Sequence, residues 1–475
     1  MRDIRAFIEL LEERGQLRRI VEEVDWNLEV GAISRRACEL RAPALLFEHV
    51  KDYPDRPILA NPLATMGRLA LAMGMDEGAG VLDIIEEYIR RMQRPIKPVE
   101  VQGGPCKEEV HLGEEADVLE FPAPLIHQGD GGRYLGTWHL IAVKDPDSGW
   151  VNWGMYRMMV LDRHRLGGIF VPTQHGPFLY FQKYEPRGVP MPFAVAIGTD
   201  PLCALVACNP FEYGVNEVDV AGGFRGAPVE LVRCETVDLY VPAASEIVIE
   251  GEVLPGEREP EGPFGEYTGY MAGGRAPRPV YRVKAITHRR RPILTMSNMG
   301  MPLDDSDVMN SVGFSAAITL ELRRKGFPLR APALVVPECS LHLVAVSTAV
   351  PYAGIARQIA QAIWSDKCGQ YVPYVIVCDG DVDISSRDAI LHALATRCHP
   401  VNGIEVTRRT TGNPLTPFYT PEERRHVIGH ACLFDCTWPT EWPPEAIPRK
   451  MSFESAYPPE LQQRVLARWR RLMGG

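Results

Sequence analysis

Two carboxylates five residues apart, Glu261 and Glu266, could support acid–base chemistry. The sequence between them is Gly-Pro-Phe-Gly, in which Pro263 fixes its own φ while Gly262 and Gly265 reach backbone angles closed to other residues. We therefore predict a rigid, shaped loop that holds the two acids at different depths. Different depths give different pKa values, which general acid–base catalysis requires. An ordinary polar turn is the alternative interpretation of the same residues.

A second cluster of candidate residues begins at 151–157, Val-Asn-Trp-Gly-Met-Tyr-Arg. Arg157 carries a planar, permanently charged guanidinium that suits a carboxylate or phosphate. Asn152, His175 and Glu217 together offer an amide oxygen, an imidazole and a carboxylate, a donor set that suits a divalent cation such as Mn²⁺ or Mg²⁺. Their spacing follows no short ligand motif, so a turn, a loop hydrogen bond and a solvated acid are the alternative explanations.

Composition excludes several classes of protein. A chain of 475 residues predicts two or three domains, and 45% hydrophobic with 24% charged residues is typical of a globular enzyme. The net charge of -10 argues against nucleic-acid binding. Eleven scattered cysteines without a Cys-x-x-Cys pair, and no signal-peptide core, indicate reduced thiols in a cytoplasmic protein. No apolar run is long enough for a membrane span.

The pattern along the chain predicts an α/β (α+β) protein of three domains. Residues 1–115 are expected to form a small N-terminal α/β domain, 116–305 a central split-barrel-like domain, and 306–475 a C-terminal α/β domain with a terminal helix. The expected helices are 3–16, 29–40, 83–92, 314–325, 355–364 and 460–473. The expected strands are 44–47, 58–60, 139–142, 156–161, 193–197, 204–207, 236–241, 246–250, 280–287, 293–297, 341–346 and 374–378.

Two motifs give the sequence a family resemblance. Residues 152–157 resemble the Asn-x-Gly-x-Tyr-Arg signature of the UbiD family of prenylated-FMN-dependent decarboxylases, and residues 261–266 resemble its Glu-Gly-Pro-[Phe/Tyr]-Gly-[Asp/Glu] loop. Segments in the family's order also match its pattern at 221–226, 242–251, 375–379 and 396–398. The likeness therefore covers nearly the whole chain, and it implies a flavin-binding central domain and a C-terminal oligomerisation domain.

The resemblance implies prenylated FMN as cofactor, a divalent cation (Mn²⁺ or Mg²⁺) that bridges to the cofactor phosphate, and K⁺ as a further candidate. A phosphate dianion in a protein of net negative charge needs such a counter-charge. By resemblance, the metal ligands are Asn152, His175 and Glu217, and the catalytic network is Arg157, Glu261 and Glu266. The implied cofactor contacts are Met155, Tyr156, Arg157, Pro172, Thr173, Gln174, Asn209 and Pro210.

One position departs from the family. Many members carry a lysine directly before the late strand, where this chain has Pro373 and Tyr374. We therefore expect that Lys367 or another cation substitutes, or that this contact is absent.

The expected reaction is reversible, non-oxidative decarboxylation of an aromatic or heteroaromatic acid of the hydroxybenzoate or protocatechuate type. Losing CO2 from an sp2 carbon requires an electron sink that no side chain provides. In this scheme Arg157 anchors the substrate carboxylate, Glu266 donates the proton, and Glu261 holds Arg157. Residues 299–310, apolar with acids alongside, are expected to border the substrate.

Several alternatives stay open at this point. The substrate could be an α,β-unsaturated acid of the cinnamate kind or a polyprenyl hydroxybenzoate. The chain could also be a non-catalytic subunit of a larger carboxylase, or a metal-dependent hydrolase with Glu266 as base. The resemblance further implies a flavin prenyltransferase that supplies the cofactor, and a homodimer or hexamer.

Overall fold

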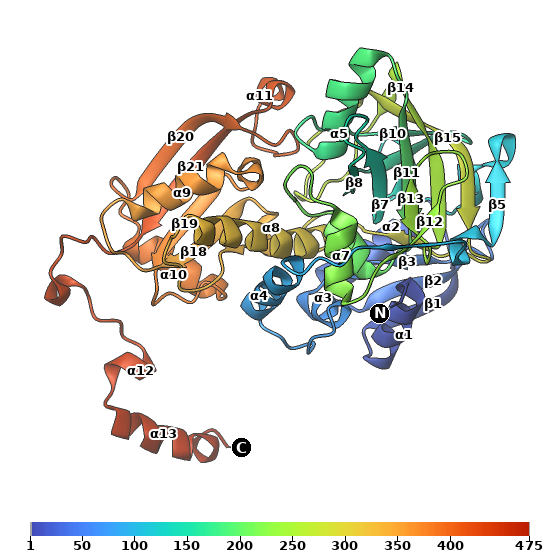
Figure 1. Cartoon of the computed structure of the whole chain (residues 1–475). Helices are drawn as coiled ribbons and strands as arrows, with labels where there is room; N and C mark the ends of the chain where they lie inside the picture. Colours follow the sequence, from blue (N-terminus) through green and yellow to red (C-terminus); the bar gives the residue numbers. More distant parts are fainter. Residues whose placement is uncertain (1, 475) are drawn as a thin grey trace.

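A four-stranded sheet and four helices form the N-terminal body of the protein, whose computed structural model describes residues 2–474 (Figure 1). Its strands lie in the order β1-β2-β3-β16. The helix predicted at the N-terminus is confirmed: the Asp3 side chain accepts a hydrogen bond from the Ala6 amide, and Phe7 and Leu11 are buried. The elements are α1 (Ile4–Glu13), β1 (Leu17–Val24), α2 (Glu29–Glu39), β2 (Ala44–Val50), β3 (Ile58–Ala60), α3 (Met66–Ala72), α4 (Val81–Met92) and β16 (Leu294–Met296).

A nine-stranded sheet forms the central body and curls into a barrel-like shape (Figure 1). Its strands follow the order β6-β9-β10-β15-β14-β11-β7-β8, and β5 also pairs with β15. Because β14 ends at Glu261 and β15 starts at Ala276, the two-carboxylate loop is the connection of a long antiparallel hairpin. The strands are β5 (Glu109–Leu112), β6 (Tyr134–Gly136), β7 (His139–Lys144), β8 (Val151–Gly154), β9 (Met158–Asp162), β10 (Arg165–Gly168), β11 (Met191–Ile197), β14 (Ile247–Glu261) and β15 (Ala276–His288).

Helices and a small second sheet complete the central body. The helices are α5 (His175–Leu179), α6 (Pro201–Ala207) and α7 (Glu217–Arg225), and the three-stranded sheet comprises β13 (Tyr240–Pro242), β12 (Glu230–Arg233) and β4 (Val99–Val101). The predicted strand 204–207 is wrong, since these residues belong to α6. Asp200 caps that helix by accepting from the Leu202 amide at 2.8 Å, and Pro201 fits its first turn. The strand predicted at 236–241 shrinks to β13.

A five-stranded sheet in the order β17-β18-β19-β21-β20 forms the C-terminal body. The predicted β-α-β unit is confirmed, because β18 and β19 pair in parallel and α9 connects them. The elements are α8 (Asp305–Arg324), β17 (Leu334–Val335), β18 (Leu343–Thr348), α9 (Ile355–Ser365), β19 (Tyr374–Asp379), α10 (Arg387–Arg397), β20 (Ile404–Thr411), α11 (Pro421–His426), β21 (Ile428–Cys436), α12 (Phe453–Ala456) and α13 (Pro459–Leu472).

Helix α8 connects the C-terminal body to the rest of the molecule, and α12 and α13 extend away from it (Figure 1). The predicted mixed α and β fold is therefore confirmed. The division into domains at residues 115 and 305 stays a prediction. Two strand pairs cross the predicted boundary at residue 115: β5 lies before it but pairs with β15, and β16 lies after it but pairs with β3. Within residues 2–474, no helix is both long and apolar enough to cross a bilayer.

Candidate active site

An arginine and two glutamates from three separate segments meet beside the barrel. Arg157 lies in the turn between β8 and β9, Glu261 ends β14, and Glu266 follows in the hairpin loop. The Arg157 guanidinium donates to both oxygens of Glu261, from Nε at 2.9 Å and from Nη2 at 3.0 Å, and its Nη1 contacts Glu266. The predicted catalytic network is thus assembled as a contiguous cluster.

Burial strengthens the ion pairs between Arg157 and the two glutamates, because little water screens them. The side chains of Glu261 and Glu266 are 1% and 5% exposed, and the guanidinium lies 5.3 Å from the centre of the Phe264 ring. Tyr134 donates to Glu261 at 2.8 Å, and burial raises the pKa of this phenol, which keeps it a neutral donor. The Arg157 guanidinium thus contacts two buried carboxylates at once.

The two acids differ in what they face. A cavity of about 890 Å³, including its open mouth, lies between the barrel and the C-terminal body, and Arg157 and Glu266 line it. Glu261 is not among the lining residues and lies behind Arg157, where Tyr134 also binds it. Only Glu266 of the pair can therefore reach a molecule in the cavity.

One face of α8 forms the opposite wall of this cavity. Ser306, Asn310 and Phe314 line it at intervals of four residues, so they project from the same side of the helix. Leu415 and Tyr371 of the C-terminal body complete that wall. The cavity is thus enclosed by the barrel on one side and by α8 with the C-terminal body on the other.

A second, polar cavity adjoins the first, and the three predicted metal ligands line it. Asn152 comes from β8, while His175 and Glu217 are the first residues of α5 and α7. The Asn152 side chain donates to Glu217 at 2.7 Å. The structure thus brings all three to one site, although they are up to 65 residues apart in sequence.

A lysine also enters this second cavity. Lys367 Nζ lies 2.9 Å from His175 Nε2 and donates to the Phe211 carbonyl at 3.0 Å. Lys367, one candidate for the role of the family's lysine, thus reaches the second cavity from the 3-10 helix η7 (Lys367–Gln370).

Burial shifts the pKa values of these groups. It raises the pKa of Glu217 to about 7, because a charged carboxylate is desolvated there. It lowers the pKa of His175 to about 4, with Lys367 as a second cause, and that of Lys367 to about 8. Before any ligand binds, the site therefore presents a neutral imidazole and a carboxyl that ionises near neutral pH.

Most of the predicted cofactor contacts lie between the two cavities. Met155, Tyr156 and Gln174 line both, and Asn209 and Pro210 line the second. Pro172 and Thr173 line neither: Pro172 points to solvent, and Ile169 and Val171 lie in the first cavity instead. In this conformation, Pro172 and Thr173 therefore do not reach the space in which the cofactor is expected to bind.

Two glycines hold the Tyr156 ring against the cavities. A Cβ on Gly154 would overlap the Tyr156 hydroxyl, and one on Gly176 would lie 2.9 Å from the ring. The Tyr156 hydroxyl accepts from the Gly176 amide at 3.1 Å. This packing explains why the motif has glycine at 154, two residues before the tyrosine.

The segment expected to border the substrate does so only in part. Met299, Ser306 and Asn310 line the first cavity, whereas Met301 is 55% exposed and lies in a different surface hollow. Asp304 does not face the cavity. It caps α8 by accepting from the Ser306 and Asp307 amides, so the expectation of acids beside the substrate is wrong for this residue.

The predicted segment 299–310 includes Ser306 and Asn310 of α8, but sequence reasoning missed Phe314, Tyr371 and Leu415, which complete the same wall. Tyr134 was also missed, and no local pattern distinguishes it from a core tyrosine.

Three carboxy-lyase family models together match most of the chain. The chain matches the 3-octaprenyl-4-hydroxybenzoate carboxy-lyase N-terminal domain over residues 8–88, the Rift-related domain over 97–302 and the C-terminal domain over 310–436. It is 34% identical to the pyrrole-2-carboxylic acid decarboxylase of Pseudomonas aeruginosa, over 98% of this chain and 97% of that protein. It is 33% identical to the phenolic acid decarboxylase of Bacillus subtilis, over 92% of each.

Solved structures of UbiD-class enzymes share the fold of this chain. The vanillic acid decarboxylase of Sedimentibacter hydroxybenzoicus in its closed form superposes with a TM-score of 0.89 at 31% identity, covering 100% of this chain and 99% of that one. An evolved dimeric form of the enzyme HmfF of Pelotomaculum thermopropionicum, in complex with prFMN, gives 0.80 at 30% identity, covering 94% and 97%. The chain belongs to the UbiD family.

Proposed function

We propose that this protein catalyses the reversible, non-oxidative decarboxylation of an aromatic or heteroaromatic carboxylic acid with prenylated FMN. The observation that carries the proposal is the asymmetry of the two buried acids around Arg157. Glu266 and Arg157 face the cavity, while Glu261 lies behind the guanidinium. A carboxylate substrate needs one cationic anchor and one proton donor, and this wall presents one of each.

The residues present fit the cofactor. Largely apolar walls around Met155 and Tyr156 suit an aromatic ring system, and the adjoining polar cavity with Lys367 suits a phosphate. The buried Asn209 Oδ1 has no hydrogen-bond partner within the described chain and lines that polar cavity. When bound, prenylated FMN would supply the electron sink that loss of CO2 from an sp2 carbon requires.

A divalent cation, Mn²⁺ or Mg²⁺, suits the oxygen and nitrogen donors of Asn152, Glu217 and His175. These hard ligands favour such ions, and the cation would neutralise the phosphate next to it. A K⁺ ion is a further candidate in the same region. These assignments rest on the shared cavity and on the donor types.

The roles of the chain's own residues follow from their positions. Arg157 binds and orients the substrate carboxylate, and Glu261 fixes the guanidinium through two hydrogen bonds. Orientation of this kind can lower a barrier by up to about 7–11 kcal/mol. Glu266 delivers the proton to the carbon that has lost CO2. Phe314 and Leu415 shield the reacting carbon from water.

The cavity favours a small aromatic acid with a polar substituent. Asn310, Ser306 and Asn413 place amides and a hydroxyl among apolar walls, which matches a ring that bears a hydroxyl or a ring nitrogen. We therefore favour hydroxybenzoate, protocatechuate and pyrrole-type acids over cinnamates and polyprenyl hydroxybenzoates. We also propose a homodimer or hexamer, with a flavin prenyltransferase as the source of the cofactor.

The test is a CO2-release assay on protein co-expressed with a flavin prenyltransferase, with a panel of hydroxybenzoates, pyrrole-2-carboxylate and cinnamates. Glu266→Gln is expected to abolish turnover while cation and flavin stay bound. Loss of the flavin from that variant would remove the evidence for a proton donor. Activity of flavin-free protein with Mn²⁺ alone would instead support the hydrolase, and inactivity of the loaded wild type on every acid would support a non-catalytic subunit.

A further inference from the structure

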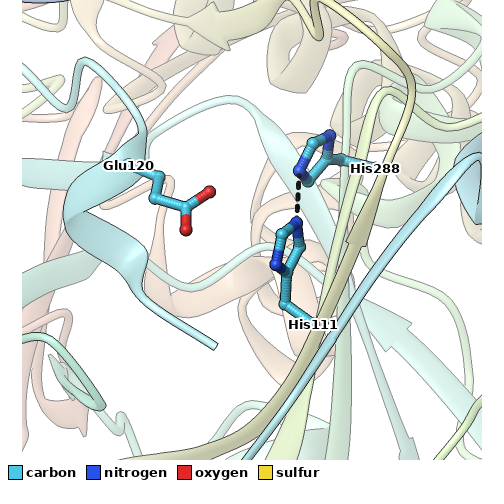
Figure 2. A group of neighbouring side chains, drawn as sticks. All are labelled: His111, Glu120 and His288. Atoms are coloured by element: carbon cyan, nitrogen blue, oxygen red, sulfur yellow. Dashed lines mark hydrogen bonds between the residues drawn. The ribbon is translucent and has the colours of Figure 1, made fainter. Parts of the chain in front are cut away.

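Three potential metal ligands meet at the edge of the barrel, away from the active site. They are His111 of β5, Glu120 at the end of the 3-10 helix η3 (Val118–Glu120), and His288, the last residue of β15 (Figure 2). One ligand atom from each lies within 4.8 Å of the other two. Figure 2 shows the Glu120 carboxylate directed toward the two imidazole rings.

Strand register brings the two histidines together. β5 pairs antiparallel with β15, with His111 opposite Ile286 and Glu109 opposite His288. His111 and His288 are therefore diagonal neighbours on one face of the pair, a position from which long side chains touch. The chain then turns through η3 and returns Glu120 to the same face.

The two rings are already arranged as ligands. His288 Nδ1 lies 2.7 Å from the Arg289 carbonyl, so it carries the proton and leaves Nε2 with a free lone pair. This carbonyl contact is the usual outer support of a metal-bound histidine. His288 Nε2 and His111 Nε2 lie 3.2 Å apart. Two nitrogens bound tetrahedrally to zinc at about 2.0–2.1 Å would be separated by about 3.3–3.4 Å.

The third ligand provides the charge. Within residues 2–474 the Glu120 carboxylate takes part in no hydrogen bond or ion pair, so its oxygens are available to the cluster. Arg56, whose guanidinium lies 5.9 Å from the Phe121 ring centre, adds positive charge near His288, and Glu120 offsets it. Two imidazoles and one carboxylate are a ligand set that zinc uses in proteins, with water as the fourth ligand.

We propose that His111, Glu120 and His288 bind one Zn²⁺ ion that fastens β5 and η3 to the end of β15. β5 has β15 as its only partner strand in the described sheets, and the ion would add a link between β5, η3 and the end of β15. The site is separate from the cofactor cavities: β15 starts beside the Glu261 hairpin and runs 13 residues before it reaches His288. At about 3.3 Å per residue, the two sites lie at opposite ends of the strand.

The test is zinc titration of tag-free, full-length protein stripped with EDTA, against a chromophoric chelator, with Co²⁺ absorption as a second readout. We expect one tight equivalent in wild type and more than about tenfold weaker binding in His111→Gln and in Glu120→Gln. The matched control is Glu115→Gln, at a neighbouring exposed acid, which should bind like wild type. Zinc should also raise the unfolding temperature of wild type and of the control, and of neither ligand variant.

A further variant distinguishes zinc bound at His111, Glu120 and His288 from zinc bound in the second cavity, at Asn152, His175 and Glu217. Glu217→Ala should retain the tight zinc equivalent, because Glu217 lies in the other cavity. Full zinc binding in both ligand variants would overturn the proposal, as would zinc binding lost only in Glu217→Ala. A wild type that takes up no zinc would show instead that the two rings simply hydrogen-bond to each other.

Discussion

Replacing Glu261 by glutamine tests whether the two buried acids have different tasks. Glu261 accepts from Arg157 Nε and Nη2 and from the Tyr134 hydroxyl, and its carboxylate is 1% exposed. An amide of the same shape keeps one oxygen, but its NH2 group faces an Arg157 donor. The variant therefore loses one charge-assisted hydrogen bond while the residue stays in place.

The expected size of the effect follows from that lost bond. A hydrogen bond to a charged group contributes about 1.5–3 kcal/mol. If the whole loss falls on the placement of Arg157, kcat/KM decreases about 10- to 150-fold, since about 1.36 kcal/mol corresponds to a factor of ten. The free energy of unfolding should fall by a similar amount, because the guanidinium keeps only Glu266 as a carboxylate partner. Glu261→Gln should thus be slower and less stable, yet still active.

The assay is CO2 release by the flavin-loaded enzyme, together with urea unfolding of the same preparation. Tyr134→Phe is the comparison variant, because it removes a hydrogen bond to the Glu261 carboxylate and leaves both bonds from Arg157 in place. It should cost up to about 1.5–3 kcal/mol of unfolding free energy but reduce kcat/KM less than Glu261→Gln does. If Glu261→Gln is fully inactive at wild-type stability while Glu266→Gln retains activity, the two roles are reversed and the argument from cavity exposure is wrong.

Three further predictions concern other residues. Lys367→Met should weaken FMN binding about 10- to 150-fold, the equivalent of one charge-assisted hydrogen bond of about 1.5–3 kcal/mol, as measured by quenching of FMN fluorescence; unchanged affinity would remove Lys367 from the phosphate site. Glu217→Ala should lose both Mn²⁺ and flavin, measured by elemental analysis and by the visible spectrum, and a full flavin complement would contradict the cation assignment. Burial lowers the pKa of His139 from 6.5 to about 4, so this group stabilises the fold above pH 6.5 and loses that contribution as the pH falls toward 4. At pH 5 the free energy of unfolding should be about 2 kcal/mol lower than at pH 7 because of this group. In His139→Gln the decline in unfolding free energy between pH 7 and 5 should be flatter, and an unchanged slope would refute the role of His139.

The sequence was most informative where a local pattern has a local cause. The capped amphipathic helix at Asp3 and the apolar strands at 374–378 follow from periodicity and end signals alone. The same reasoning failed at 204–207, where an apolar run suits either a strand or a helix. There Asp200 and Pro201 were the deciding signals, and both precede the run.

The site was predictable only where one short motif carries several functional residues. Arg157 and Glu266 belong to two such motifs, and the structure places them together. Phe314 comes from α8 and Lys367 from the C-terminal body, and their approach to the barrel depends on packing within a core that both bodies share. No pattern within either segment encodes that packing, so Phe314 was not predicted and Lys367 was named only through the family resemblance.

The chemistry and the shape of the cavity come from different bodies of the protein. The barrel provides Arg157 and Glu266, fixed by the hairpin and by Glu261, whereas α8 and the C-terminal body provide Phe314, Leu415 and Asn413. A hydrogen-bonded charge cluster tolerates few substitutions, because each loss leaves a buried charge unpaired. An apolar or amide-bearing wall can change its outline with a smaller penalty. Differences in substrate between relatives should therefore arise mainly from the C-terminal wall, while the proton donor and the carboxylate anchor stay the same.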